Sequence, residues 1–253
     1  MGDGTVILDG FNLTGPDRLG DWKQLGQIEG WFSSPSIKDR KVSRPHGPGS
    51  FKTPVEYDER LITYNGRVIS ANHGYLHEAA GQLAALGHDG EMQFSVSGHG
   101  PTQFAMVELR ADGIKPVFET DNYMSFQIQL KAVDPYKYGE RRPVQVASGA
   151  SEPVFHRGTV DAWPKAYVSG NMPDGYTLTL GGQQVSVPMG IPSGATHTID
   201  YRRRRLYVNG SLFMGAFGAS NFRSVPPGRR TTAALAAPSG SGSATFTVYD
   251  TYV

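Results

Sequence analysis

A strictly alternating run that stops at a proline divides this sequence into two halves. From Met124 to Lys131, apolar and polar residues alternate, which is the period of a strand with one buried and one solvated face. Pro135 has no N–H to donate to a sheet and disfavours a helical backbone at Asp134. The run therefore predicts a strand that ends there, and we interpret the polar segment after it as a joint between two domains. Its candidate residues are Asp134, Pro135, Tyr136, Tyr138 and Gly139.

The composition predicts mainly β architecture in two domains. With 32 glycines and 17 prolines among 253 residues, the apolar residues fall in many short runs separated by turn formers. A chain of this length lies near the upper limit for one hydrophobic core. We therefore expect two β-sandwich domains, residues 1–136 and residues 137–253, the first with one inserted α-helix.

In the first half the periodicity predicts an antiparallel sheet and one helix. Leucines and alanines recur every three or four residues over residues 76–86, and Gly87 is placed to end a helix. Asn65-Gly66 lies between two β-rich runs, so residues 60–70 are predicted to form a hairpin with a type I′ turn. The expected strands are residues 5–8, 92–96, 104–109, 115–118 and 123–132. The segment around Trp22 is compatible with a short helix or with a loop packed on a sheet.

In the second half, short alternating runs at a regular spacing predict a β-sandwich. Asn209-Gly210 predicts a second two-residue hairpin. The Gly- and Ser-rich residues 238–243 are interpreted as a flexible link before the last strand. The expected strands are residues 144–147, 154–157, 165–168, 176–180, 185–187, 197–200, 206–208 and 245–249.

Charge is divided unevenly between the halves. Residues 1–136 hold 12 Lys/Arg against 17 Asp/Glu, a net charge of −5, whereas residues 137–253 hold 12 against 6, a net charge of +6. This balance argues against a dedicated nucleic-acid binder and points to partner surfaces. Five residues in two basic segments are candidate protein contacts, with a solvated surface as the alternative. They are Arg44, His46, Gly49, Arg203 and Arg205.

The sequence lacks the common catalytic and cofactor motifs. It contains no GxxxxGK[ST] phosphate loop, no GxGxxG before a helix, no HExxH and no GxSxG. The absence of cysteine excludes disulfides, thiolate metal sites and cysteine catalysis. His73 and His77 are four residues apart, but we interpret them as surface histidines rather than a metal pair. We therefore expect no enzyme, no catalytic residues, no cofactor and no metal.

One enzymatic function and one binding function remain as weaker interpretations. A β-sandwich with paired carboxylates could be a glycosidase, but the acidic residues of the second half fall mostly in turn-like contexts. Exposed aromatic residues could form a platform that stacks on sugars, although strand alternation favours core packing for them. The aromatic residues in question are Trp163, Tyr167, Tyr176 and Tyr207.

No run of about 18 apolar residues is present, so we expect no membrane anchoring.

Several motifs occur in a fixed order. They are RPHGPGS at 44–50, ERLITYNGRVIS at 59–70, AVDPYKYG at 132–139, GTVDAWPKAYVSG at 158–170 and TIDYRRRRLYVNGS at 198–211. In this order, with the single helix between the second and third, they resemble the distal tail protein (Dit-like, minor tail protein) family of long-tailed siphophages. The resemblance spans nearly the whole chain, and DPYKYG is among its most specific parts.

The resemblance implies a structural virion protein of the phage tail tip. The first domain resembles one that forms a homohexamer ring between the tail-tube protein above and the tip or baseplate hub protein below. The second resembles a galectin-like or carbohydrate-module sandwich, which in some relatives docks receptor-binding proteins. Tape-measure and receptor-binding proteins are therefore further candidate partners, and residues 245–253 are a candidate strand to return to the first domain.

In such a ring, DNA is expected only as the passing genome. Acidic residues of the first domain are then expected to line the channel, where repulsion would keep the genome from sticking. The protein would be made in the host bacterial cytoplasm and reside in the virion. The alternative function is a carbohydrate-binding module for host recognition.

Overall fold

The computed structural model describes residues 4–38, 44, 48, 51, 56–88, 90–215 and 217–253. The chain forms two compact units, which we call unit 1 (Met1–Lys137 with Val253) and unit 2 (Tyr138–Tyr252). Each unit has its own hydrophobic core. The protein is mainly β with large antiparallel sheets, as predicted. Among the described residues, no helix is long and apolar enough to cross a membrane.

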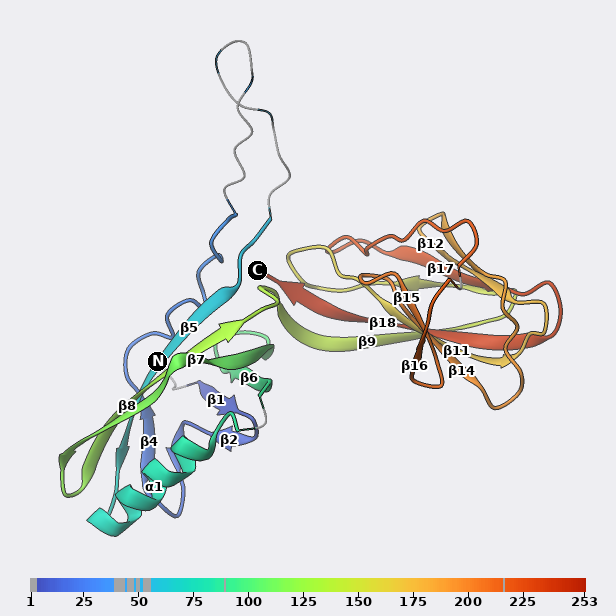
Figure 1. Cartoon of the computed structure of the whole chain (residues 1–253). Coiled ribbons are helices and arrows are strands. Elements are labelled where there is room, and N and C mark those ends of the chain that lie inside the picture. The colour runs from blue at the N-terminus through green and yellow to red at the C-terminus, as the bar shows by residue number, and fades with distance from the viewer. Residues whose placement is uncertain are drawn as a thin grey trace. The chain divides into compact units, whose positions relative to one another are not determined.

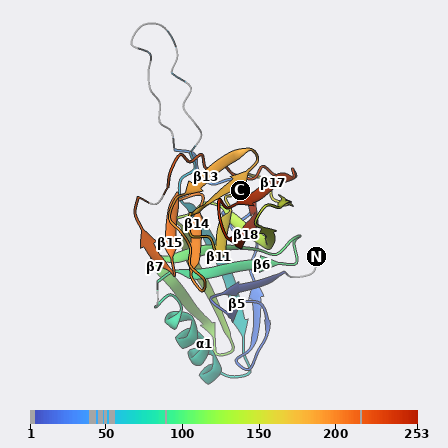
Figure 2. The same cartoon turned by 90° about the vertical axis from the view of Figure 1, so that its right-hand side faces the viewer.

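Unit 1 combines antiparallel strands with one helix. Its elements are β1 (Thr5–Leu8), β2 (Phe11–Asn12), β3 (Gly15–Pro16), β4 (Asp21–Gln24), β5 (Arg60–Ile69), α1 (His73–Ala85), β6 (Met92–Ser97), β7 (Gln103–Thr120) and β8 (Tyr123–Ala132). The strands pair in the order β7-β8-β5-β4-β3, while β6 pairs with β7 and with β1, which also pairs with β2. The helix packs against β5 and β7 (Figure 1, Figure 2).

The helix α1 forms where the sequence predicts it and begins three residues earlier. Asn72 caps it, because its side-chain oxygen accepts a hydrogen bond from the Tyr75 N–H at 3.0 Å. Leu76, Ala79 and Leu83 are its buried residues. The chain leaves the helix at Gly87, whose φ of +79° is a conformation that glycine adopts readily.

The hairpin predicted at Asn65-Gly66 is wrong. β5 runs unbroken through both residues and pairs with β8, with Asn65 opposite Gln127 and Gly66 opposite Phe126. The glycine is needed for packing rather than for a turn. A Cβ at position 66 would lie 2.3 Å from the Cζ atom of the Phe126 ring, so the ring occupies the space a side chain would fill.

Two further elements of unit 1 differ from expectation. The strands predicted at residues 104–109 and 115–118 are parts of one strand, β7, whose pairing with β8 shifts register between Leu109 and Ile114. Such a bulge bends a strand without ending it. Trp22 lies in β4 and is only 1% exposed, so its segment is neither a helix nor a loop.

Unit 2 contains two sheets in separate layers (Figure 1). Its strands are β9 (Lys137–Ala147, whose first residue belongs to unit 1), β10 (Ser151–Val154), β11 (Lys165–Asn171), β12 (Tyr176–Leu180), β13 (Gln183–Val187), β14 (Thr196–Asp200), β15 (Arg205–Val208), β16 (Ser211–Phe213), β17 (Thr231–Ala236) and β18 (Ser241–Tyr252). One sheet has the order β16-β15-β14-β11-β18-β9 and the other β10-β17-β12-β13. The buried core of unit 2 takes side chains from both sheets.

The turn signals of unit 2 are partly confirmed. Asn209 and Gly210 join β15 to β16 with φ angles of 47° and 84°, as the hairpin prediction requires. The flexible link predicted at residues 238–243 is wrong for its last three residues, which belong to β18. Gly242 is required there because a Cβ would lie 2.5 Å from the Ser169 carbonyl oxygen on the neighbouring strand. β17 was not anticipated.

Candidate functional site

Two buried cations meet in unit 1. Arg60 opens β5 and Lys137 opens β9, and they are 1% and 5% exposed. The Arg60 guanidinium donates hydrogen bonds to backbone carbonyl oxygens: Nε to Pro135 at 2.9 Å, and Nη1 to Gly30 at 2.6 Å and to Ser33 at 2.8 Å. The Arg60 guanidinium therefore depends on main-chain oxygens.

Lys137 makes a similar contact with the same loop. Its Nζ donates to the Trp31 carbonyl oxygen at 2.8 Å and lies 5.4 Å from the centre of the Trp31 ring. The ring itself is 1% exposed. Carbonyl and ring together partly replace the water that the ammonium loses on burial.

A glycine brings this loop to the cations. Gly30 has a φ of +76°, and a Cβ there would lie 1.8 Å from the Leu61 carbonyl oxygen. The preceding residue, Glu29, forms a β-bridge with Thr63. Any other residue at position 30 would push the loop away from β5, and its carbonyls would no longer reach Arg60.

Neither cation is paired with a carboxylate within the described part of the chain. Burial lowers the pKa of Lys137 to about 8, and the neighbouring Arg60 charge adds to the effect. Burial likewise lowers the pKa of Arg60. The Nη2 atom of Arg60 is buried and has no hydrogen-bond partner among the described residues. The result is a concentration of positive charge inside a unit whose sequence is acidic overall.

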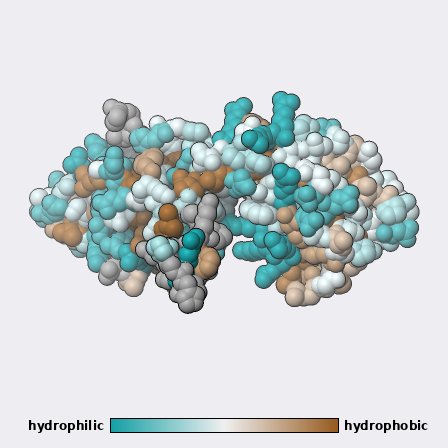
Figure 3. Space-filling model, turned by 90° about the horizontal axis from the view of Figure 1, so that it is seen from above, coloured by the Kyte–Doolittle hydropathy of each residue, from teal (hydrophilic) through white to brown (hydrophobic). Residues whose placement is uncertain are grey.

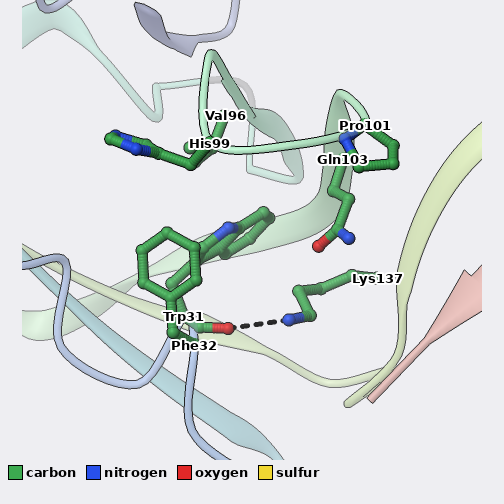
Figure 4. Close-up of a pocket in the computed structure, with 7 residues that line it drawn as sticks. All are labelled: Trp31, Phe32, Val96, His99, Pro101, Gln103 and Lys137. Atoms are coloured by element: carbon green, nitrogen blue, oxygen red, sulfur yellow. Dashed lines mark hydrogen bonds between the residues drawn. The ribbon is translucent and has the colours of Figure 1, made fainter. Parts of the chain in front are cut away.

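A half-open pocket of about 130 Å³ lies beside Lys137 (Figure 4). In Figure 4 the Gln103 side chain reaches toward the Lys137 ammonium, which bonds to the Trp31 carbonyl. The pocket is lined by Trp31, Phe32, Val96, His99, Pro101, Gln103 and Lys137. Phe32 is 56% exposed and its ring meets the edge of His99 with centroids 6.0 Å apart. A buried cation thus shares a cavity wall with two aromatic rings and with the polar side chains of His99 and Gln103.

The residues predicted as a joint are divided between the two units. On the unit 1 side, Pro135 supplies a carbonyl to Arg60, and the Tyr136 ring packs 6.3 Å from that of Tyr57. Asp134 accepts a hydrogen bond from the Tyr136 N–H at 3.4 Å. The segment is therefore held to unit 1 up to the start of β9.

The other two predicted joint residues lie in β9 within unit 2. The Tyr138 hydroxyl accepts a hydrogen bond from Arg202 at 2.9 Å, and its ring packs 6.0 Å from that of Tyr249. At Gly139 a Cβ would lie 3.0 Å from the Tyr252 ring. The residues of DPYKYG thus make these contacts within the unit to which each belongs.

The candidate protein contacts are surface residues where the structure describes them. Arg44 is exposed, with its guanidinium 5.7 Å from the centre of the Phe51 ring. His46 and Gly49 lie outside the described residues. Arg203 and Arg205 are exposed around the β14–β15 turn, where the Arg203 N–H donates to Asp200 at 2.9 Å. On the face shown in Figure 3, hydrophilic residues project from both units.

His73 and His77 share one face of α1. Their Nε2 atoms are 2.8 Å apart, and both rings pack on Phe118 with centroids 5.9 and 4.8 Å away. No group of three or more potential metal ligands occurs within the described residues.

Three of the four aromatic residues considered for sugar stacking are not in the core of unit 2. Tyr176 is buried, but Trp163 and Tyr167 are each 38% exposed and Tyr207 is half-buried. Core packing was therefore the wrong expectation for these three. Tyr167 and Tyr207 project from the same face of the sheet, because Thr198 on β14 pairs with Tyr167 on β11 and with Tyr207 on β15.

No sequence motif indicates the Arg60–Lys137 site, although one signal was available. Strand alternation places Arg60 on the same face as Ile62 and Tyr64, both of which are buried. A cation in an inward-facing position must find polar partners. Its partners, however, come from a loop about 30 residues earlier and from Pro135 in the segment after β8, which strand alternation does not reveal.

No family model matches the sequence, and no curated protein matches it. Among solved structures, the Dit protein of phage SPP1 matches over 99% of this chain and 99% of its own, with a TM-score of 0.72 and 18% sequence identity. The fold is Dit-like. The SPP1 protein is described as a paradigm of the hub adsorption apparatus in phages that infect Gram-positive bacteria.

A second solved structure has a similar fold. A chain of the phage p2 baseplate, in its activated conformation with strontium, matches over 97% of this chain and 98% of its own, with a TM-score of 0.52 and 6% identity. The family resemblance expected from the sequence motifs is therefore confirmed at the level of the fold.

Proposed function

We propose that this protein is a structural component of a phage tail tip, assembling as a homohexamer ring that joins the tail tube to the tip or baseplate and supports receptor-binding components. The observation that carries the proposal is the Dit-like fold over both units of the chain. A likeness confined to unit 2 would support only a general β-sandwich, since that architecture serves many functions. The likeness of unit 1 gives the proposal its specificity.

In this proposal unit 1 forms the ring and unit 2 lies at its periphery. The tail-tube protein binds one side of the ring, and the tip or baseplate hub protein binds the other. The net charge of −5 on residues 1–136 supports a lumen that repels the passing genome. Mapping charge on the assembled ring tests that detail, and a lumen lined by Lys and Arg would contradict it.

The location of the protein can be tested on virus particles. Gold-labelled antibodies raised against the full chain should mark one end of the tail in negative-stain electron micrographs. Pre-incubating the antibodies with the purified protein is the control and should abolish the label. Labelling of the capsid, or particles that lack the protein, would refute the proposal.

A carbohydrate-binding role for unit 2 is the second candidate, and the exposed aromatic residues favour it. Tyr167 and Tyr207 stand on one face of a sheet with Thr198 between them, an arrangement in which rings can stack on sugars. Glycan-array binding by the full chain, lost in Tyr167→Ala but retained in Tyr75→Ala of unit 1, would support this role. Absence of any glycan signal in the wild-type protein would count against it.

A further inference from the structure

The charge balance around Lys137 is incomplete. Two other cations of the described chain show the usual arrangement with a carboxylate partner: Arg142 pairs with Asp250 at 2.7 Å, and Lys131 pairs with Glu108 at 2.9 Å. Lys137 is more deeply buried than Lys131 and has no such partner among the described residues. A buried charge without a counter-charge costs free energy that backbone dipoles compensate only in part.

Hydrogen-bonding capacity is also left over at this site. An ammonium has three N–H donors, and Lys137 uses one of them on the Trp31 carbonyl oxygen. The Lys137 side chain lines the pocket of about 130 Å³, so its remaining donors can be reached from that space. The Gln103 amide, which reaches toward the ammonium (Figure 4), offers a second polar group.

The pocket dimensions and walls indicate which anion fits. A cavity of about 150 Å³ accommodates a molecule the size of benzene, so this one takes a carboxylate with a short aliphatic stem. Trp31, Phe32 and Pro101 supply apolar walls suited to such a stem. A phosphate would require several converging donors, such as a helix N-terminus or a backbone nest, whereas here a single ammonium dominates.

We propose that the pocket beside Lys137 binds a carboxylate group, and that in the assembled protein an Asp or Glu side chain of a second copy of the chain supplies it. The part of this proposal that concerns a second copy rests on the proposed ring. An acidic unit that carries a cationic pocket is complementary to itself in a head-to-tail contact, which is the kind of contact that closes into rings. The net charge of −5 on residues 1–136 makes a carboxylate donor abundant on the neighbouring copy.

Carboxylate binding by the pocket is tested on the unassembled wild-type protein with acetate as the probe. The side-chain resonances of Lys137 are followed by NMR from pH 6.5 to 9.5 at constant ionic strength, with sodium acetate replacing sodium chloride. Acetate should bind saturably and raise the pKa of Lys137 by about one unit at ten times its Kd, because it binds only the charged form. A Lys137 titration that is identical in acetate and in chloride would overturn the claim that the pocket binds a carboxylate.

Variants separate the pocket from general charge effects. Gln103→Leu should weaken acetate binding several-fold, and Lys131→Met, which removes an exposed and paired lysine, should leave it unchanged. Equal acetate binding in Gln103→Leu and wild type would contradict the position of the carboxylate in the pocket, even if a Lys137 variant failed to fold.

The source of the carboxylate is tested in the assembled protein without acetate. Ring formation should raise the pKa of Lys137 as acetate does, and Lys137→Met should weaken assembly at least tenfold. If the ring forms and Lys137 keeps its dispersed-state pKa, the second copy does not supply the carboxylate, while the ring itself stands. If no ring forms under any condition, the proposed function fails, and so does the claim that a second copy supplies the carboxylate. The acetate titration still decides whether the pocket binds a carboxylate.

Discussion

Replacing Gly66 by alanine tests the account of β5 that the structure gives. The added Cβ would lie 2.3 Å from Cζ and 2.8 Å from Cε2 of the Phe126 ring, distances that force a rearrangement. The ring is 3% exposed and is held between the aromatic rings of Trp22 and Tyr64, at centroid distances of 5.7 and 6.0 Å. It therefore has little space into which it can move.

The expected magnitude follows from two opposing effects. Overpacking a well-filled core costs about 1 to 3 kcal/mol. Alanine offsets roughly 0.5 to 1 kcal/mol of this, because it loses less backbone entropy than glycine on folding. We expect Gly66→Ala to lower the free energy of unfolding of unit 1 by about 1 to 2 kcal/mol, or its Tm by roughly 4 to 8 °C.

The assay is urea denaturation followed by tryptophan fluorescence in a Trp163→Phe background, where both remaining tryptophans, Trp22 and Trp31, lie in unit 1. Gly81→Ala is the matched control. It lies inside α1, and apart from the adjoining helix backbone no atom of the described residues lies within 4 Å of the added Cβ, so it should stabilise unit 1 by up to about 1 kcal/mol.

A second substitution identifies the cause of the loss. If the Phe126 ring causes it, Gly66→Ala should cost clearly less in a Phe126→Leu background than in the parent protein. A Gly66→Ala protein as stable as its parent would refute the packing argument. The same loss with and without the Phe126 ring would also refute it and point to the backbone instead.

Three other outcomes follow from the structure. The pKa of Lys137 falls from 10.5 to about 8 on folding, so between these pH values the unfolded chain binds more protons than the folded one. The stability of unit 1 should therefore rise with pH from about 8 upward, by at most about 3 kcal/mol. In urea denaturation up to pH 9.5, Lys137→Met should remove this rise, and an unchanged dependence of stability on pH would contradict the prediction. Burial raises the pKa of Asp250, but hydrogen bonds from Arg142 and the Arg157 N–H outweigh it and leave the pKa lowered, so this stabilisation should be lost as pH falls below 3.8. Asp250→Asn should destabilise unit 2 by about 1 to 3 kcal/mol at pH 7, measured by Trp163 fluorescence, and unchanged stability would refute the role of this pair. Asn72→Ala should cost about 1 kcal/mol of unit 1 stability in thermal denaturation, and a loss below a few tenths would show that the cap is dispensable.

The sequence predicts elements whose signals are local. The helix follows from its apolar spacing and from Gly87, and β8 has the predicted bounds because alternation and Asp134-Pro135 both act within a few residues. The two Asn-Gly pairs show the limit of such signals. Asn209-Gly210 makes the expected turn, whereas Gly66 lies in a strand because Phe126, 60 residues later, packs on it.

The candidate site could not be predicted for the same reason. Arg60 is recognisable as a cation on an inward-facing strand position, but Lys137 stands in a polar segment that resembles a linker. The two meet only because Gly30 allows a loop to approach β5 and present its carbonyls. Contacts of this kind depend on tertiary structure, and periodicity in the sequence carries no information about them.

The most direct test of the proposed function is a cryo-electron microscopy reconstruction of the tail tip of particles that contain this protein. We expect a six-fold ring at the junction of tail tube and tip, into which six copies of unit 1 fit, with unit 2 outside the ring. A junction built from a different fold, or density for this chain elsewhere in the particle, would contradict it.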